Sequence, residues 1–206
     1  MAYTSVVGES ATEKTIEKSR FITFVAHVTD EEEARAFLLS VRERHPLATH
    51  VCYAFIADKT GNLQRFSDDG EPQGTAGMPI LGVLKAQKLF ETAVAVVRYF
   101  GGIKLGAGGL TRAYAGCAAE AVEAAERRTY EMCEEVILRV DYAEVNAAIR
   151  LLEGEEVLSR EFGAGASFTV AVREADAESF RGRARDYLNG RVEFSEGNRY
   201  YHPFKN

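Results

Sequence analysis

The chain has 206 residues, of which 46% are hydrophobic and 27% charged, and its formal net charge is -6. These values are ordinary for a globular protein and leave room for a sizeable core or two small domains. The negative charge argues against a protein whose whole surface binds nucleic acid, because nonspecific affinity for phosphates needs a basic surface. Residues 1–128 hold 15 basic and 16 acidic side chains, against 10 and 15 in the remainder, so a polyanion contact is expected in the first part.

No apolar run approaches the roughly 20 residues that cross a bilayer, and the N-terminal residues lack the basic flank and apolar centre of a signal peptide. The three cysteines are odd in number, far apart and without CxxC spacing, so neither a disulfide framework nor a zinc site is indicated. We therefore expect a cytoplasmic protein with no membrane segment, metal ion or cofactor.

The first 46 residues are predicted to contain one strand and one helix. Residues 1–13 have few apolar side chains and are expected to be a loose lead-in. The run from Ile16 to Val28 is rich in β-branched and aromatic residues, which indicates a strand. Asp30 can cap a helix over residues 31–45, which has acids in its first turn, bases in its last and one apolar face. Pro46 ends this helix.

A hairpin and a second helix follow. Residues 49–57 are predicted to be a strand that turns at residues 60–62 and returns over residues 63–66. The next segment, Ser67–Pro79, reads SDDGEPQGTAGMP, and we call it the acidic loop because it holds Asp68, Asp69 and Glu71. Residues 78–90 have apolar side chains at helical spacing and are predicted to be a helix.

The most unusual stretch of the chain runs from Val94 to Tyr114 and reads VAVVRYFGGIKLGAGGLTRAY. Its apolar run predicts a strand that ends near Phe100. We call the segment Gly101–Gly109 the glycine turn, and it leads to a predicted alanine-rich helix over residues 110–128.

Beyond residue 128 the pattern changes to four predicted strands and two predicted helices in the order βαββαβ, that of a ferredoxin-like domain. The strands span residues 132–140, 155–162, 167–173 and 191–200, and the helices span residues 142–153 and 175–189. We therefore predict an α+β protein of two domains, residues 1–128 and residues 129–206.

The glycine turn is a candidate anion-binding site. Its glycines allow the main chain to approach a ligand, and the N–H groups at the start of the following helix favour an anion. Lys104 and Arg112 add positive charge. In the alternative interpretation the glycines serve only tight turns and close packing. Neither the phosphate-loop pattern nor the dinucleotide pattern is present. The glycines are Gly101, Gly102, Gly106, Gly108 and Gly109.

If the protein is an enzyme, its candidates for acid–base chemistry are His50, Asp68, Asp69 and Glu71. The three acids can equally be turn residues that form local hydrogen bonds. His50 lies two residues from Cys52 on one face of a strand, where the two could share a metal ion. We favour a half-buried, hydrogen-bonded histidine beside a core thiol, because the sequence offers no matching second pair.

Arg98 lies in the most apolar predicted strand, and a buried guanidinium is costly unless it is paired. It is expected either to meet a carboxylate of the acidic loop or to reach the end of the strand and bind a ligand. We favour the internal pair. Such a pair would join the acidic loop and the glycine turn into one composite surface.

Five segments give the sequence a close resemblance to the YigZ/IMPACT family. They are SRF at Ser19–Phe21, HP at His45–Pro46, ATHVCYA at Ala48–Ala54, SDDGEPQGTAGMPIL at Ser67–Leu81, and VVRYFGGIKLGAGGLTRAY at Val96–Tyr114. The resemblance implies a first domain with the fold of the second domain of ribosomal protein S5. It also implies a second, ferredoxin-like domain similar to a C-terminal domain of elongation factor G.

The resemblance further implies a role in translation, because eukaryotic relatives regulate translation and bacterial members suggest contact with nucleic acid or the ribosome. The first hypothesis is a noncatalytic protein that binds RNA or a ribosomal surface through Arg98, Lys104, Arg112 and the glycine turn, with a translation factor as a further candidate partner. The second is an enzyme on a small phosphorylated or anionic substrate. The third is a protein–protein adaptor without nucleic acid. The oligomeric state does not follow from the sequence.

Overall fold

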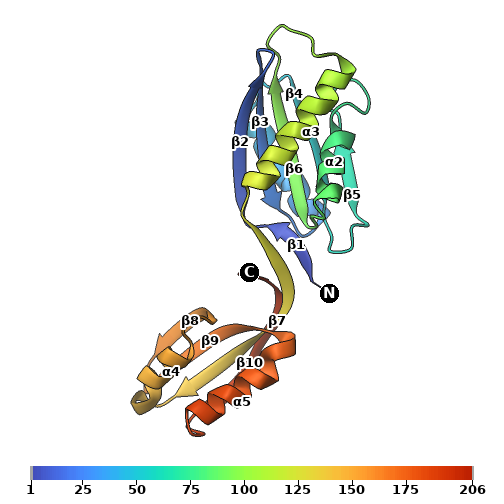
Figure 1. Ribbon diagram of the computed structural model, residues 1–206. Coiled ribbons are helices and arrows are strands. Elements are labelled where there is room, and N and C mark those ends of the chain that lie inside the picture. Colours follow the sequence, from blue (N-terminus) through green and yellow to red (C-terminus); the bar gives the residue numbers. More distant parts are fainter. Residues whose placement is uncertain (1, 206) are drawn as a thin grey trace. The chain divides into compact units, whose positions relative to one another are not determined.

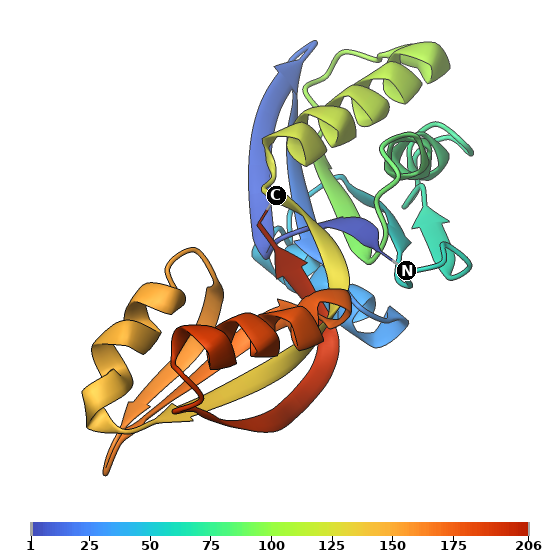
Figure 2. The ribbon, with the colours of Figure 1, turned by 60° about the horizontal axis from the view of Figure 1, so that its bottom comes forward.

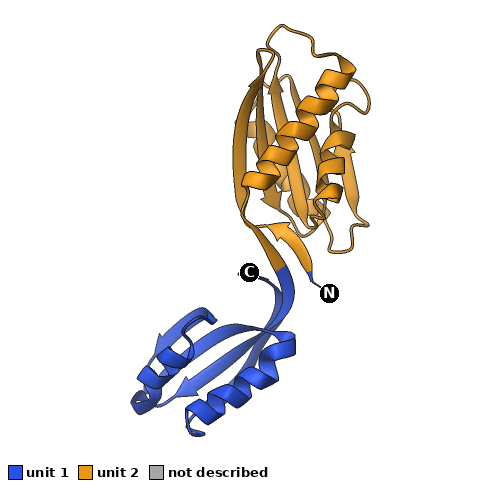
Figure 3. Ribbon diagram, viewed as in Figure 1, with its two compact units in different colours: residues 1–2, 130–206 blue, residues 3–129 orange. Residues whose placement is uncertain are grey.

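The computed structural model describes residues 2–205. The chain divides into two compact units, one formed by residues 3–129 and the other by residue 2 together with residues from 130 onward (Figure 3). Each unit combines helices with an antiparallel sheet, so the prediction of an α+β protein is confirmed. In the described part of the chain, no helix is both long and apolar enough to cross a membrane.

The first unit is built on a five-stranded sheet with the order β2-β3-β6-β4-β5 (Figure 1). Every neighbouring pair in this sheet is antiparallel. The strands are β2 (Glu9–Ile16), β3 (Ser19–His27), β6 (Thr92–Tyr99), β4 (His50–Ile56) and β5 (Gln64–Ser67). The predicted hairpin of residues 49–66 is the β4–β5 pair.

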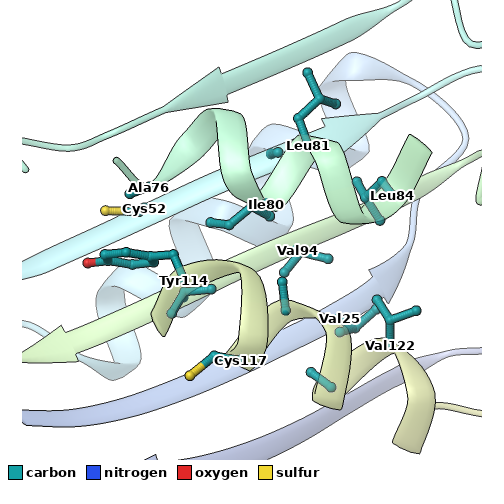
Figure 4. Close-up of a cluster of buried hydrophobic side chains, with 14 of the residues drawn as sticks. Val25, Cys52, Ala76, Ile80, Leu81, Leu84, Val94, Tyr114, Cys117 and Val122 are labelled. Atoms are coloured by element: carbon teal, nitrogen blue, oxygen red, sulfur yellow. The ribbon is translucent and has the colours of Figure 1, made fainter. Parts of the chain in front are cut away.

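Helices cover both faces of this sheet. Helices α2 (Gly77–Ala86) and α3 (Gly106–Ala124) lie on one face (Figure 1), where they enclose a core that contains Tyr114 and Cys52 (Figure 4). Helix α1 (Glu31–Arg44) packs on the other face, and the Asp30 carboxylate accepts a hydrogen bond from the Glu33 N–H as predicted for its cap. Central strand β6 is therefore buried on both sides, which explains its unbroken apolar run.

The prediction of a loose lead-in over residues 1–13 is wrong from residue 3 onward, and residue 1 lies outside the described residues. Residues Tyr3–Val6 form strand β1, which pairs with β7 (Arg127–Val140), and β2 begins at Glu9. Ser5 is fully buried, and its hydroxyl donates to the Glu91 carbonyl at 3.0 Å and lies 2.9 Å from His27 Nδ1. Strand β2 lies at the edge of the sheet and its residues are exposed or half-buried. Its sequence is therefore largely polar and lacks the apolar pattern by which a strand is predicted.

Two helix boundaries also differ from the predictions. Helix α3 begins at Gly106, inside the glycine turn, and it ends at Ala124 because residue 127 already starts β7. The basic residues near position 128 therefore do not close this helix. Helix α2 ends at Ala86 and not near residue 90, since Lys88 and Glu91 adopt positive φ values of 53° and 47° before β6 begins.

The second unit has the predicted order βαββαβ, with the strands arranged β10-β7-β9-β8. Two short 3-10 turns precede its helices, and the last strand runs on to Phe204 instead of ending near residue 200. The helices lie on one face of the sheet (Figure 2) and enclose a core around Phe168 and Phe180. The elements are α4 (Val145–Leu151), β8 (Glu156–Phe162), β9 (Ala166–Arg173), α5 (Ala177–Tyr187) and β10 (Glu193–Phe204).

Candidate functional site

The acidic loop and the end of β6 meet in a buried ion pair. Arg98 Nη1 lies 2.6 Å from Glu71 Oε1, and the two side chains are only 5% and 4% exposed. The same carboxylate oxygen accepts a hydrogen bond from the Tyr114 hydroxyl of α3 at 2.8 Å. The prediction of an internal Arg98–carboxylate pair is confirmed. Arg98 is thereby neutralised and enclosed, so its charge is not displayed on the surface.

Ser19 at the start of β3 connects this pair to the glycine turn. Its hydroxyl oxygen accepts from Arg98 Nη2 at 3.2 Å and from the Gly101 N–H at 3.3 Å. The guanidinium carbon of Arg98 also lies 5.5 Å from the ring centres of Phe21 and of Phe100. Arg98 Nε is buried without a hydrogen-bond acceptor among the described residues. A continuous set of contacts therefore runs from the acidic loop through Arg98 to the glycine turn.

Asp68 caps the helix that follows the acidic loop. Its two carboxylate oxygens accept from the N–H groups of Gly74 at 2.8 Å, Ala76 at 3.0 Å and Gly77 at 2.8 Å. Burial alone would raise the pKa of the Asp68 carboxyl, but these three donors outweigh it and hold the pKa below its ordinary value. The N–H groups of the cap residue Ala76 and of Gly77, the first residue of α2, thus bond to a side chain eight residues upstream of the cap.

Asp69 and His50 hold the acidic loop against β4. The Asp69 carboxylate accepts from the Val51 N–H at 2.6 Å and pairs with Arg42 at 3.0 Å. His50 Nδ1 lies 2.7 Å from the Asp69 carbonyl oxygen, and because a carbonyl can only accept, Nδ1 carries the proton. His50 Nε2 faces Glu71 Oε1 at 3.9 Å. The interpretation of His50 as a half-buried, hydrogen-bonded side chain is confirmed.

Cys52 is a core thiol. It is fully buried and donates to the Asp68 carbonyl at 2.9 Å, and Figure 4 shows it close to the Tyr114 hydroxyl and Ala76. Burial raises the pKa of the Cys52 thiol to about 12, so it is protonated at neutral pH and is a poor nucleophile. Burial likewise raises the pKa of Tyr114. Among the described residues, no three His, Cys, Asp or Glu side chains are grouped to hold a metal ion.

At two positions of the glycine turn the structure explains why the residue is glycine. A Cβ on Gly101 would lie 1.9 Å from the Lys18 carbonyl oxygen, so no other residue fits between β6 and the β2–β3 turn. Gly106 has a φ of 68° at the first position of α3, a conformation that favours glycine. The packing interpretation therefore accounts for Gly101 and Gly106. It does not account for the charge and exposure of this segment.

The start of α3 is exposed and cationic. Its first turn contains no acid, its N–H groups donate to no capping side chain within the described residues, and Gly106, Ala107 and Gly108 are exposed. Lys104 and Arg112 are also exposed, and within residues 2–205 neither forms an ion pair. The three carboxylates of the acidic loop point instead to Arg98, Arg42 and backbone N–H groups. We call the surface formed by Lys104, the first turn of α3 and Arg112 the cationic rim.

Ser19, Phe100 and Tyr114 are part of this arrangement but were not among the predicted site residues. Ser19 and Tyr114 contact partners that lie 79 and 43 residues away in sequence, which local patterns do not reveal. The available signal was their position inside the segments that carry the family resemblance. The sequence predicts for Phe100 only that it ends a strand.

Comparison with known proteins places this geometry in a family. Residues 17–122 match the Impact N-terminal domain. An IMPACT family member of Haemophilus influenzae is 40% identical over 184 residues, covering 87% of this chain and 89% of that protein. The IMPACT family member YvyE of Bacillus subtilis is 35% identical over 205 residues, covering 97% and 93%. A crystal structure described as that of a hypothetical protein is 34% identical, with a TM-score of 0.63 and coverage of 94% and 96%.

Proposed function

Because the chain belongs to the IMPACT family, we propose that it is a noncatalytic, translation-associated protein that binds RNA or a ribosomal surface through the cationic rim. One observation carries the proposal. The acids next to the glycine turn have their charges satisfied inside the fold, whereas Lys104, Arg112 and the N-terminal N–H groups of α3 face outward. An acidic chain thus keeps a local surface that suits phosphate.

The rim binds phosphate by summing several weak contacts. A helix N-terminus contributes about 0.3 to 1 kcal/mol to an exposed anion, and each exposed cation adds a salt-sensitive contribution of similar size. A single phosphate would therefore be held weakly. A polyanion that contacts the helix start, Lys104 and Arg112 together gains from all three, which favours nucleic acid over a small phosphorylated molecule.

The contacts of the acid–base candidates also support a binding role. His50, Asp68, Asp69 and Glu71 each have a partner within the protein, and these partners position the acidic loop. An acid–base role would require one of these groups to reach the substrate as well, whereas each of these contacts is made to another group of the protein. The thiol of Cys52 is buried and protonated.

The test is the salt dependence of binding to a fluorescent single-stranded RNA, measured by anisotropy for the full chain. The variant Lys104→Glu/Arg112→Glu reverses two charges on the rim. The matched control Lys85→Glu/Lys88→Glu makes the same charge change on exposed residues at the far end of α2. We expect the control to bind like the wild type.

The rim variant is expected to lose at least tenfold in affinity, and its log–log salt slope should fall by about 1.4, since each lost phosphate contact to a single strand contributes about 0.7. Equal binding by all three proteins would overturn the proposal. Absence of salt-dependent binding by the wild type would also overturn it and would favour the adaptor hypothesis.

A further inference from the structure

Phe100 lies between β6 and the glycine turn, four residues before Lys104, and it is not part of the core. The residue is 46% exposed, although the neighbouring strand is buried on both faces. The Arg98 guanidinium carbon lies 5.5 Å from the centre of its ring. The ring of Phe100 therefore contacts the Arg98 guanidinium, while almost half of the residue remains exposed to solvent.

The backbone on each side of Phe100 is fixed. Its own N–H donates to the Thr49 hydroxyl at 3.0 Å. The next residue, Gly101, is packed so closely on the Lys18 carbonyl that a Cβ would lie 1.9 Å from it, and its N–H donates to Ser19. An aromatic side chain has few rotatable bonds, so a ring on such a backbone is ordered before any ligand arrives and loses little entropy on binding.

From this geometry we propose that Phe100 is a stacking platform for an unpaired nucleobase, so that the cationic rim selects single-stranded RNA over duplex RNA. The inference rests on the proposed function and adds the class of ligand. Every base has a π face, so an exposed aromatic ring beside cations suits single strands of any sequence. The bases of a duplex are stacked on one another and cannot reach the ring.

Two exposed cations that could contact the backbone of such a strand follow Phe100 in the sequence. Lys104 lies four residues beyond Phe100 within the glycine turn, and Arg112 lies in the second turn of α3. A protein partner with an apolar contact at Phe100 is the competing occupant, and the test separates the two.

The test uses the absence of tryptophan from the sequence. The Phe100→Trp variant gains a single indole at the platform. The control Phe66→Trp gains one on β5 of the same unit, where Phe66 is also 46% exposed. A base that stacks on the indole quenches its fluorescence. We expect single-stranded RNA to quench the Phe100→Trp variant and leave the Phe66→Trp variant unchanged, and duplex RNA of the same length to quench neither.

Affinity supplies the second readout. Phe100→Leu keeps an apolar side chain but removes the π face, and we expect it to bind single-stranded RNA about 5- to 100-fold more weakly with an unchanged salt slope. Phe66→Leu should bind like the wild type. Thermal unfolding of each variant verifies that the fold is intact.

The two proposals fail in different ways. Salt-dependent binding that persists in Phe100→Leu at full affinity, or equal quenching by single-stranded and duplex RNA, would overturn the stacking inference and leave the proposed function standing. A wild-type protein that shows no salt-dependent RNA binding removes both.

Discussion

Helices α2 and α3 lie on the same face of one sheet, but within the described residues only the N-terminus of α2 is capped by a carboxylate. The carboxylate of Asp68 accepts from the N–H groups of Ala76 and Gly77 at the start of α2. Within residues 2–205, no side chain caps the start of α3 in this way, and its first turn contains no acid. One N-terminus is therefore occupied by a carboxylate of the protein itself, whereas the other has no anionic partner among the described residues.

The comparison shows that counts of charges in a segment do not give the charge of its surface. The acidic loop contains three acids, but Asp68, Asp69 and Glu71 direct their charges to N–H groups, Arg42 and Arg98. The glycine turn contains one formal charge, Lys104, and displays it. Three substitutions test this contrast, and they are ordered by the size of the expected effect.

The largest effect is expected from Glu71→Ala. It leaves Arg98 buried and unpaired and removes the acceptor of the Tyr114 hydroxyl, so the free energy of unfolding should fall by about 3 to 5 kcal/mol. Denaturant unfolding of the full chain measures this change. The exposed Glu32 of α1 gives the control Glu32→Ala, which should stay within about 0.5 kcal/mol of the wild type. Similar losses in the two variants would show that the buried pair is not what holds the acidic loop.

Gly101→Ala should have the next largest effect, because its Cβ would overlap the Lys18 carbonyl and force the β2–β3 turn away from the glycine turn. We expect a loss of about 2 to 3 kcal/mol in the free energy of unfolding. Gly116 of α3 has nothing within 4 Å of its added Cβ, so Gly116→Ala should instead stabilise by about 0.5 to 1 kcal/mol. Thermal unfolding of both variants measures these changes, and we expect Gly101→Ala to lower the stability and Gly116→Ala to raise it. An unchanged stability of Gly101→Ala would contradict the close contact with the Lys18 carbonyl.

The smallest effect is expected from Asp68→Asn, which removes the negative charge and replaces one accepting oxygen by an NH2 group, so it should destabilise the fold by about 1 to 2 kcal/mol at neutral pH. The pKa of Asp68 is lower in the folded chain than its ordinary value, so its carboxylate stabilises the fold above about pH 4 and this contribution is lost as the pH falls further. The stability gap between wild type and Asp68→Asn should therefore narrow below pH 4. A gap that stays constant down to pH 2 would show that the charge of Asp68 is not involved.

Much of the fold follows from local patterns. The apolar run from Val94 to Val97 correctly predicts a strand, and Asp30 has the side chain and position of a helix cap. The βαββαβ order of the second unit follows from periodicity in the same way. Strand β1 could not be predicted, because its burial depends on Glu91 and on β7, both distant in sequence.

The candidate site was only partly predictable for the same reason. The cost of burying a guanidinium predicted that Arg98 has a carboxylate partner, but nothing local distinguishes Glu71 from Asp68 or Asp69. The choice is made by Tyr114, whose hydroxyl reaches the same oxygen from α3. The sequence predicts that this helix starts at residue 110, four residues after its observed start at Gly106. The first turn of the helix is rich in glycine and has no apolar residue at helical spacing that would indicate its start.

Strand β1 also has a consequence for how the chain is made. The hydroxyl of Ser5 finds its acceptor at Glu91, and the N–H of Val7 finds its acceptor at the Glu126 carbonyl, 2.8 Å away. During synthesis, residues 5–7 therefore cannot complete these contacts until Glu126 has been added. Within the first unit, strand β1 docks only after helix α3 has been made.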